Sequence, residues 1–162
     1  MSLTDELLEN AERYAAEFDK GDLSMVPRRR LAIVACMDAR VNPNAIFGLV
    51  EGDAHIIRNA GGVVSDDVIR SLAISQRLLG TEEIIIVHHV DCGTRTFDNT
   101  EFMDRIEHEC GLRPPWGPGA FPVPPADIHQ SIARIRESPF LPRRSSVRGF
   151  VFDDRTGRLL EG

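Results

Sequence analysis

The sequence predicts an α/β fold with a mostly parallel central sheet flanked by helices. Short strand-forming runs alternate with segments of helical periodicity, which is the pattern of such folds. The runs LAIVAC (31–36) and EEIIIVHH (82–89) are apolar on both faces, as expected for strands buried inside a parallel sheet. A length of 162 residues fits one domain, 1–162, whose first 20 residues form an N-terminal helical arm.

The N-terminal third predicts a helix, a strand and a short helix. The first helix begins near Ser2 or Thr4, and Gly21 follows its end. The strand is 31–36, and the stretch VNPNAIFG after it (41–48) reads as a short helix capped by an asparagine and opened by a proline. Apolar residues recur at helical spacing in the first helix: Leu3, Leu7, Leu8, Ala11, Tyr14, Ala15 and Phe18.

The middle of the chain predicts a second strand at 54–58, which the turn NAGG (59–62) ends. Ser65 then caps a strong helix, whose two first-turn aspartates suit the helix dipole, and Gly80 closes it. Its apolar surface is expected from Val68, Leu72, Ile74, Leu78 and Leu79. The third strand is 82–89.

The C-terminal half predicts two helices, a loop and a hairpin. The helices are expected at 98–110 and 127–137. Between them, RPPWGPGAFPVPP (113–125) carries six prolines and is expected to be irregular. The last segment, 146–162, reads as a β-hairpin with DDRTG as its turn.

Composition excludes several classes of partner. The formal net charge is −6, which argues against nucleic acid or an anionic membrane as the main partner. The short arginine runs at 28–30 and 143–144 are interpreted as solvated edges. No run approaches the ~20 apolar residues of a membrane span, and the N-terminus has no apolar signal-peptide core. Three widely spaced cysteines form no disulfide framework, so we expect a reducing cytoplasm.

Polar residues at the ends of two apolar strands predict a metal site. Cys36 ends the first strand, and His89 ends the third strand three residues before Cys92. If these strands are neighbours where the strand order reverses, their carboxyl ends bring two thiolates and one imidazole together. That set suits zinc and leaves the fourth tetrahedral position open, as in catalytic zinc sites.

The choice of His89 over His88 follows from the alternation of side chains along a strand. His88 is expected under a helix, where it donates to a backbone carbonyl, and His55 lies at the wrong end of the sheet. The alternative is that Cys36 and Cys92 are buried structural thiols with satisfied histidines nearby. Cys110 has no partner nearby in sequence and is interpreted as structural.

Asp38 and Arg40 follow the first cysteine in CMDAR. A carboxylate beside a metal-bound water can orient the water or become the fourth ligand. An arginine that holds the carboxylate with two hydrogen bonds decides between these states. The alternative is a loop-capping aspartate and a surface arginine.

The motifs CMDAR, RNAGG and HHVDCG, in this order and spacing, resemble those of the β-class carbonic anhydrases, over about 31–93. The short chain with HH before the cysteine is similar to the compact bacterial branch. The resemblance implies zinc on Cys36, His89 and Cys92, with Asp38 and Arg40 as the catalytic pair beside it. It also implies a homodimer or a dimer of dimers, with the N-terminal helix lying across the partner.

The function implied is reversible hydration of carbon dioxide to bicarbonate and a proton, by attack of zinc-bound hydroxide. One alternative is hydrolysis of carbonyl sulfide or carbon disulfide on the same site. Another is a non-catalytic zinc-stabilised or redox-sensing module. Val90 departs from the family pattern, because many members have Ser or Thr there. A dinucleotide site is not favoured, since no G-x-G-x-x-G follows the first strand.

Overall fold

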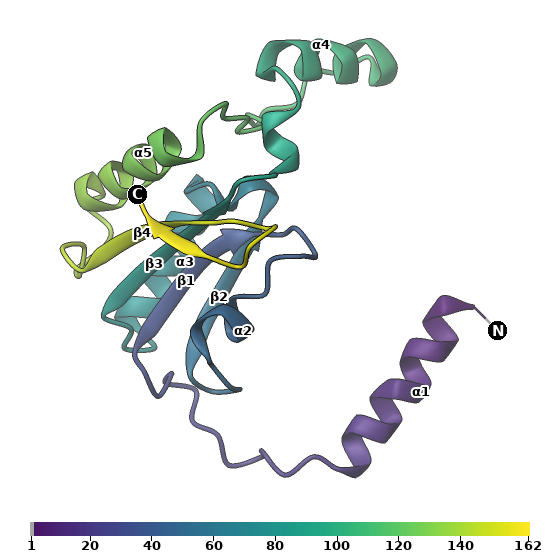
Figure 1. The fold of residues 1–162 in the computed structure, drawn as a ribbon, viewed down its shortest axis with the longest axis vertical. Coiled ribbons are helices and arrows are strands. Elements are labelled where there is room, and N and C mark those ends of the chain that lie inside the picture. The colour runs from purple at the N-terminus through teal and green to yellow at the C-terminus, as the bar shows by residue number, and fades with distance from the viewer. Residues whose placement is uncertain (1) are drawn as a thin grey trace.

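Five strands form one sheet in the computed structural model, which describes residues 2–162 (Figure 1). In spatial order they are β2 (Ala54–Asn59), β1 (Leu31–Cys36), β3 (Glu83–His89), β4 (Val147–Phe152) and β5 (Leu159–Glu161). The first four are parallel, and β5 pairs antiparallel with β4. The predicted α/β class, the predominantly parallel sheet and the C-terminal hairpin are therefore confirmed.

Within residues 2–162, five α-helices connect or extend these strands. They are α1 (Leu3–Ala16), α2 (Pro43–Phe47), α3 (Asp66–Arg77), α4 (Asn99–Cys110) and α5 (Pro124–Glu137). Two short 3₁₀ turns, η1 (Ala60–Gly62) and η2 (Gly93–Arg95), follow β2 and β3. The side-chain caps predicted at Asn42 and Ser65 are present, because each accepts a backbone N–H of the helix that follows. Asp98, expected as the first residue of its helix, instead caps α4 in the same way.

The sheet divides the core into two layers. On one face, α3 and α5 pack against alternate strand residues in the larger cluster, which includes Val34, Leu72, Ile86 and Ile135. On the other face, α2 and the residues after it cover a smaller cluster around Ile33. Because β1 and β3 lie in the middle of the sheet, their side chains are buried on both faces, as their apolar sequences indicate.

The strand order reverses at β1. The chain leaves β1 to form β2 on one side and later returns to form β3 on the other. The parallel register pairs Ala35 with Val87, so the carboxyl ends of β1 and β3 lie side by side. This is the switch point at which open α/β sheets bind ligands, and it brings the first and third motifs together.

Some expected boundaries and inward-facing positions differ from the structure. Helix α3 ends at Arg77, so Leu78 lies beyond it and is exposed, as is Ile74, while Ile69 takes the inward position. Helix α5 begins at Pro124 rather than 127, because proline fits the first helical turn, where its missing N–H is not needed. Strand β2 extends one residue further than expected, to Asn59.

Helix α1 stands apart from the sheet (Figure 1). Ser2 forms a reciprocal capping box with Asp5 at its start, yet none of its residues is buried. Leu3, Leu7, Leu8 and Tyr14 are each more than half exposed. None of the helices within residues 2–162 has both the length and the apolar character needed to cross a membrane.

Candidate metal centre

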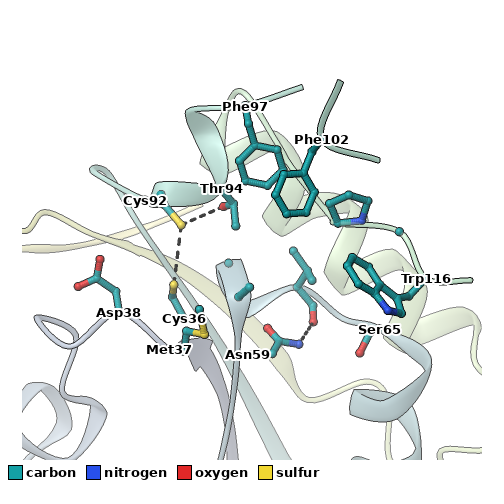
Figure 2. A pocket seen from close by; sticks show the side chains of 16 residues that line it. Cys36, Met37, Asp38, Asn59, Ser65, Cys92, Thr94, Phe97, Phe102 and Trp116 are labelled. Atoms are coloured by element: carbon teal, nitrogen blue, oxygen red, sulfur yellow. Dashed lines mark hydrogen bonds between the residues drawn. The ribbon is translucent and has the colours of Figure 1, made fainter. Parts of the chain in front are cut away.

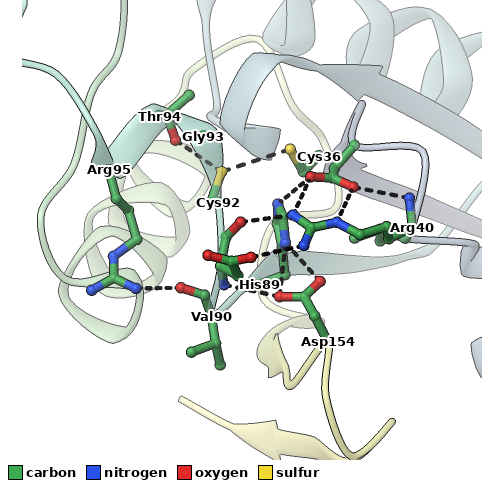
Figure 3. Close-up of polar contacts among 12 residues, drawn as sticks. Cys36, Arg40, His89, Val90, Cys92, Gly93, Thr94, Arg95 and Asp154 are labelled. Atoms are coloured by element: carbon green, nitrogen blue, oxygen red, sulfur yellow. Dashed lines mark hydrogen bonds and ion pairs between the residues drawn. The ribbon is translucent and has the colours of Figure 1, made fainter.

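Cys36, His89 and Cys92 meet at the carboxyl ends of β1 and β3 (Figure 3). One ligand atom from each, two sulfurs and one ring nitrogen, lies within 4.8 Å of the others. The two Sγ atoms are 3.8 Å apart, and all three side chains are buried. The Nε2 atom of His89 is buried and has no hydrogen-bond partner, which is costly unless a ligand completes it. This donor set fits a zinc ion.

The two thiols have different electrostatic environments. Contact with Cys92 and burial raise the pKa of Cys36, whereas the pKa of Cys92 is lowered by Cys36, by His89 and by Thr94. The Thr94 hydroxyl lies 2.9 Å from the Cys92 sulfur and can donate to its thiolate. Cys92 is therefore the more readily ionised of the two sulfurs.

His89 is oriented by Asp154, which lies at the start of the turn between β4 and β5 (Figure 3). The Asp154 carboxylate oxygens lie 2.9 and 3.1 Å from His89 Nδ1, which donates to them. Burial lowers the pKa of His89, but contacts with Cys92 and Asp154 outweigh it, so the net shift is upward. Nδ1 is thus engaged away from the sulfurs, and Nε2 faces them.

Asp38 and Arg40 form the predicted two-bond pair. Arg40 Nε lies 3.0 Å from Asp38 Oδ1, and Arg40 Nη2 lies 2.8 Å from Oδ2. The Arg40 guanidinium and backbone N–H hold the pKa of Asp38 well below its usual range. Asp38 Oδ2 is also 3.9 Å from His89 Nε2, so the carboxylate lies beside the ligand cluster. Asp91 supplies a second anchor for Arg40, through its carboxylate and its backbone carbonyl.

Arg58 fixes the loop that follows Cys36. Its Nη2 donates to the carbonyl oxygens of Cys36, Asp38 and Val41 at 2.7–2.8 Å, and its Nε donates to that of Cys36 at 3.0 Å. The loop carries both a candidate ligand and the Asp38–Arg40 pair. Arg58, which lies on β2, therefore fixes the position of this loop and of the groups that it carries.

The RNAGG turn approaches the same loop. Gly62 has φ of +68°, and a Cβ atom there would lie 2.7 Å from the Cys36 backbone nitrogen. Only glycine combines this left-handed conformation with such close contact. The turn thus brings backbone next to the cluster, as the sequence indicates.

An apolar cavity of about 550 Å³ opens onto the cluster (Figure 2). Cys36, Asp38 and Cys92 lie at one end, and the aromatic rings of Phe97, Phe102 and Trp116 line the other. The aromatic residues come from the segment after η2, from α4 and from the proline-rich loop, so this part of the chain forms the cavity wall. Its lining favours an uncharged, apolar molecule over an ion.

Comparison with known proteins identifies the family. A family model described as carbonic anhydrase matches residues 31–109. The chain is 54% identical over 161 residues to β-carbonic anhydrase 1 of Mycobacterium tuberculosis. The matched region covers 99% of this chain and 98% of that protein. The chain belongs to the β-carbonic anhydrase family.

Two further relatives are similar to this β-carbonic anhydrase along most of its length. The crystal structure of carbonic anhydrase from Streptococcus mutans superposes with a TM-score of 0.91 at 39% identity, covering 99% of this chain and 98% of that one. A protein of Acidianus named carbon disulfide hydrolase is 32% identical, over 96% of this chain and 86% of its own length. The family fold is therefore shared across the whole chain.

The other predicted residues of this β-carbonic anhydrase lie away from the cluster, with two corrections. His55 lies at the amino end of β2 beside Ser75, as expected. Cys110 is exposed, whereas a structural thiol was expected to be buried. His88 is buried under α5, but no backbone carbonyl accepts from it. Its Nε2 lies 3.3 Å from Asp127 Oδ2, and burial lowers its pKa to about 4, which keeps the ring neutral.

Val90 is 42% exposed, so a hydroxyl at this position would not be enclosed in the centre. Instead, Thr94 supplies a hydroxyl to Cys92. Thr94, Asp154 and Arg58 were not identified as site residues from the sequence. Arg58 lies in the RNAGG motif, whereas Asp154 lies in a predicted turn 65 residues from His89, where no local pattern distinguishes it.

Proposed function

We propose that this protein catalyses the reversible hydration of carbon dioxide, with zinc held by Cys36, His89 and Cys92. The observation that carries the proposal is the buried two-sulfur, one-nitrogen cluster at the end of an apolar cavity. Identity of 54% to a carbonic anhydrase along the full chain supports it. The family membership favours this enzyme over a non-catalytic zinc or redox module.

Zinc in this position would acidify a water molecule, so that a nucleophile is available near neutral pH. The apolar wall from Phe97, Phe102 and Trp116 would hold carbon dioxide and limit competing water. Asp38 accepts a hydrogen bond from the nucleophile and directs its lone pair toward the carbon atom. Arg40 keeps Asp38 in that position, and the carboxylate stays ionised because its pKa is low.

The direct test is stopped-flow carbon dioxide hydration together with metal analysis of the purified protein. We expect hydration activity and about one zinc per chain. Replacement of His89 by Ala should abolish both, whereas Cys110→Ala should change neither, because Cys110 is exposed and remote from the cluster. A zinc-loaded, folded protein without hydration activity would reject the proposed reaction.

The apolar cavity also supports a second candidate, hydrolysis of carbon disulfide or carbonyl sulfide. These molecules are linear and uncharged like carbon dioxide, and the Acidianus relative is named for the first of them. The higher identity to a carbonic anhydrase favours carbon dioxide. Parallel assays of the three gases with one preparation decide between them by the ratio of their kcat/KM values.

We further propose that the protein is a homodimer, or a dimer of dimers, that works in a reducing cytoplasm. The exposed apolar stripe of α1 supports an oligomer, because such surface normally packs against a partner. Thiolate ligands require reduced cysteines, which supports the compartment. The proposed single domain, 1–162, is consistent with a sheet that uses strands from both halves of the chain.

A further inference from the structure

The turn between β4 and β5 lies directly over His89. In the parallel register of β3 and β4, His89 pairs with Phe152, and the Val90 N–H donates to the Phe152 carbonyl at 3.0 Å. Asp154 is two residues beyond Phe152. The pairing of β3 with β4 therefore places the Asp154 side chain next to the His89 imidazole, although 65 residues separate the two in sequence.

The turn itself is fixed by Asp153. Its Oδ1 accepts the Arg155 N–H at 2.9 Å, and its Oδ2 accepts the Thr156 hydroxyl at 2.8 Å. The Asp153 N–H donates to the Arg158 carbonyl, which closes the loop at its base. These hydrogen bonds fix the backbone of the turn in which Asp154 lies. The Asp154 side chain is 4% exposed.

The contacts of Asp154 determine which nitrogen of His89 carries the proton. A carboxylate only accepts hydrogen bonds, so Nδ1 at 2.9 Å must be the N–H donor. The lone pair of the neutral ring is then on Nε2, which faces the two sulfurs and has no other partner. A carboxylate behind a ligating histidine fixes both the tautomer and the ring orientation.

The same carboxylate reaches the Asp38–Arg40 pair through the backbone. Asp154 Oδ2 accepts the Asp91 N–H at 2.9 Å. The Asp91 carbonyl and carboxylate in turn accept Arg40 Nη2 at 2.9 Å and Nη1 at 2.8 Å. One buried side chain thus touches both the imidazole and the segment that anchors Arg40.

We propose that Asp154 is a positioning residue that holds His89 in its metal-binding tautomer and steadies the Asp91 anchor of Arg40. The inference rests on the proposed role of His89 as a zinc ligand. It makes the C-terminal hairpin part of the metal centre rather than only an edge of the sheet.

The test compares Asp154→Ala with Asp154→Asn, using zinc competition against a chelator and the rate of zinc release from the loaded protein. We expect Asp154→Ala to lose about 10–100-fold in zinc affinity, the usual cost of removing such a partner. Asp154→Asn retains the volume and one acceptor oxygen, so it should recover part of the affinity while releasing zinc faster than the wild type.

A spectroscopic readout separates positioning from simple stability. Long-range ¹H–¹⁵N spectra of the zinc-free protein, recorded at a pH at which the ring is neutral, should show His89 with its proton on Nδ1, and Asp154→Ala should show a mixture of tautomers. Asp53→Asn is the matched control, because Asp53 is a buried carboxylate at the amino end of β2, away from the cluster. It should lower the melting temperature without changing zinc affinity.

Wild-type zinc affinity and an unchanged His89 tautomer in folded Asp154→Ala would overturn the positioning role. If Asp154→Ala does not fold, Asp154→Asn decides, and zinc release at the wild-type rate overturns the role. His89→Ala is measured alongside. If it binds zinc as tightly as the wild type, His89 is not a ligand, and the proposed site and the role of Asp154 both fail.

Discussion

The Sγ atoms of Cys36 and Cys92 lie 3.8 Å apart although 56 residues separate them in sequence. This distance exceeds the roughly 2.05 Å of a disulfide but suits two thiolates on one metal ion. The two sulfurs come together because β1 and β3 are neighbours at the point where the strand order reverses.

We predict that single replacement of Cys36, His89 or Cys92 by Ala abolishes zinc binding. Two remaining ligands cannot complete a tetrahedral site, and the buried sulfur left behind loses its partner. Zinc content measured after gel filtration should fall from about one per chain to near zero. Full occupancy in Cys36→Ala would contradict the assignment, and Cys110→Ala serves as the control that retains zinc.

We predict that Arg40→Ala keeps its zinc and loses most hydration activity. Without Arg40, the Asp38 carboxylate loses its two-bond partner at 2.8–3.0 Å. Asp38 should then move to the metal and block the position that water needs. Asp38→Ala should also keep zinc, but with water bound there and poorly oriented. Crystal structures of both variants distinguish these states, and near-native turnover by Arg40→Ala would contradict the gating role.

We predict that Gly62→Ala destabilises the fold more than Gly48→Ala. Both glycines have positive φ, so each substitution carries a backbone cost of about 1–2 kcal/mol. Only at Gly62 would the new Cβ also meet backbone atoms, the closest 2.7 Å away, whereas at Gly48 nothing lies within 4 Å. Equal shifts of the urea unfolding midpoint in the two variants would show that the close approach is not needed.

We predict an acid-sensitive contribution to stability from Asp53. The Val50 N–H, together with Arg28, holds the pKa of Asp53 below its usual value. A group whose pKa is lower in the folded state stabilises the protein above its unfolded pKa of about 3.9. That stability is lost as the pH falls through the folded value. Wild type and Asp53→Asn should therefore differ in unfolding free energy at pH 7 and converge in strong acid; a constant difference would contradict this.

We predict a dimer in solution that depends on the exposed stripe of α1. Leu7→Glu with Leu3→Glu should shift sedimentation toward the monomer, because both side chains are more than half exposed in the isolated chain. Glu9→Gln, a change of charge in the same helix, should leave the assembly intact. An active wild-type monomer at micromolar concentration would count against the prediction.

The sequence by itself determined the class of the fold, most helix and strand positions, and the three candidate ligands. Hydrophobic periodicity and capping residues are local, so the alternating pattern and the caps at Asn42 and Ser65 could be predicted directly. The ligands could be predicted because parallel strands bring their carboxyl ends to one edge, and Cys36 and His89 each end a strand.

Only the tertiary structure decided which distant residues complete the centre. The burial of Asp154, the hydroxyl that Thr94 offers to Cys92, and the position of His88 against Asp127 depend on strand register and helix packing. An aspartate in a DDRTG turn has the same local pattern whether it faces solvent or a histidine. The physical difference is the hydrogen bond to a ring 65 residues away, which forms only when β4 pairs with β3.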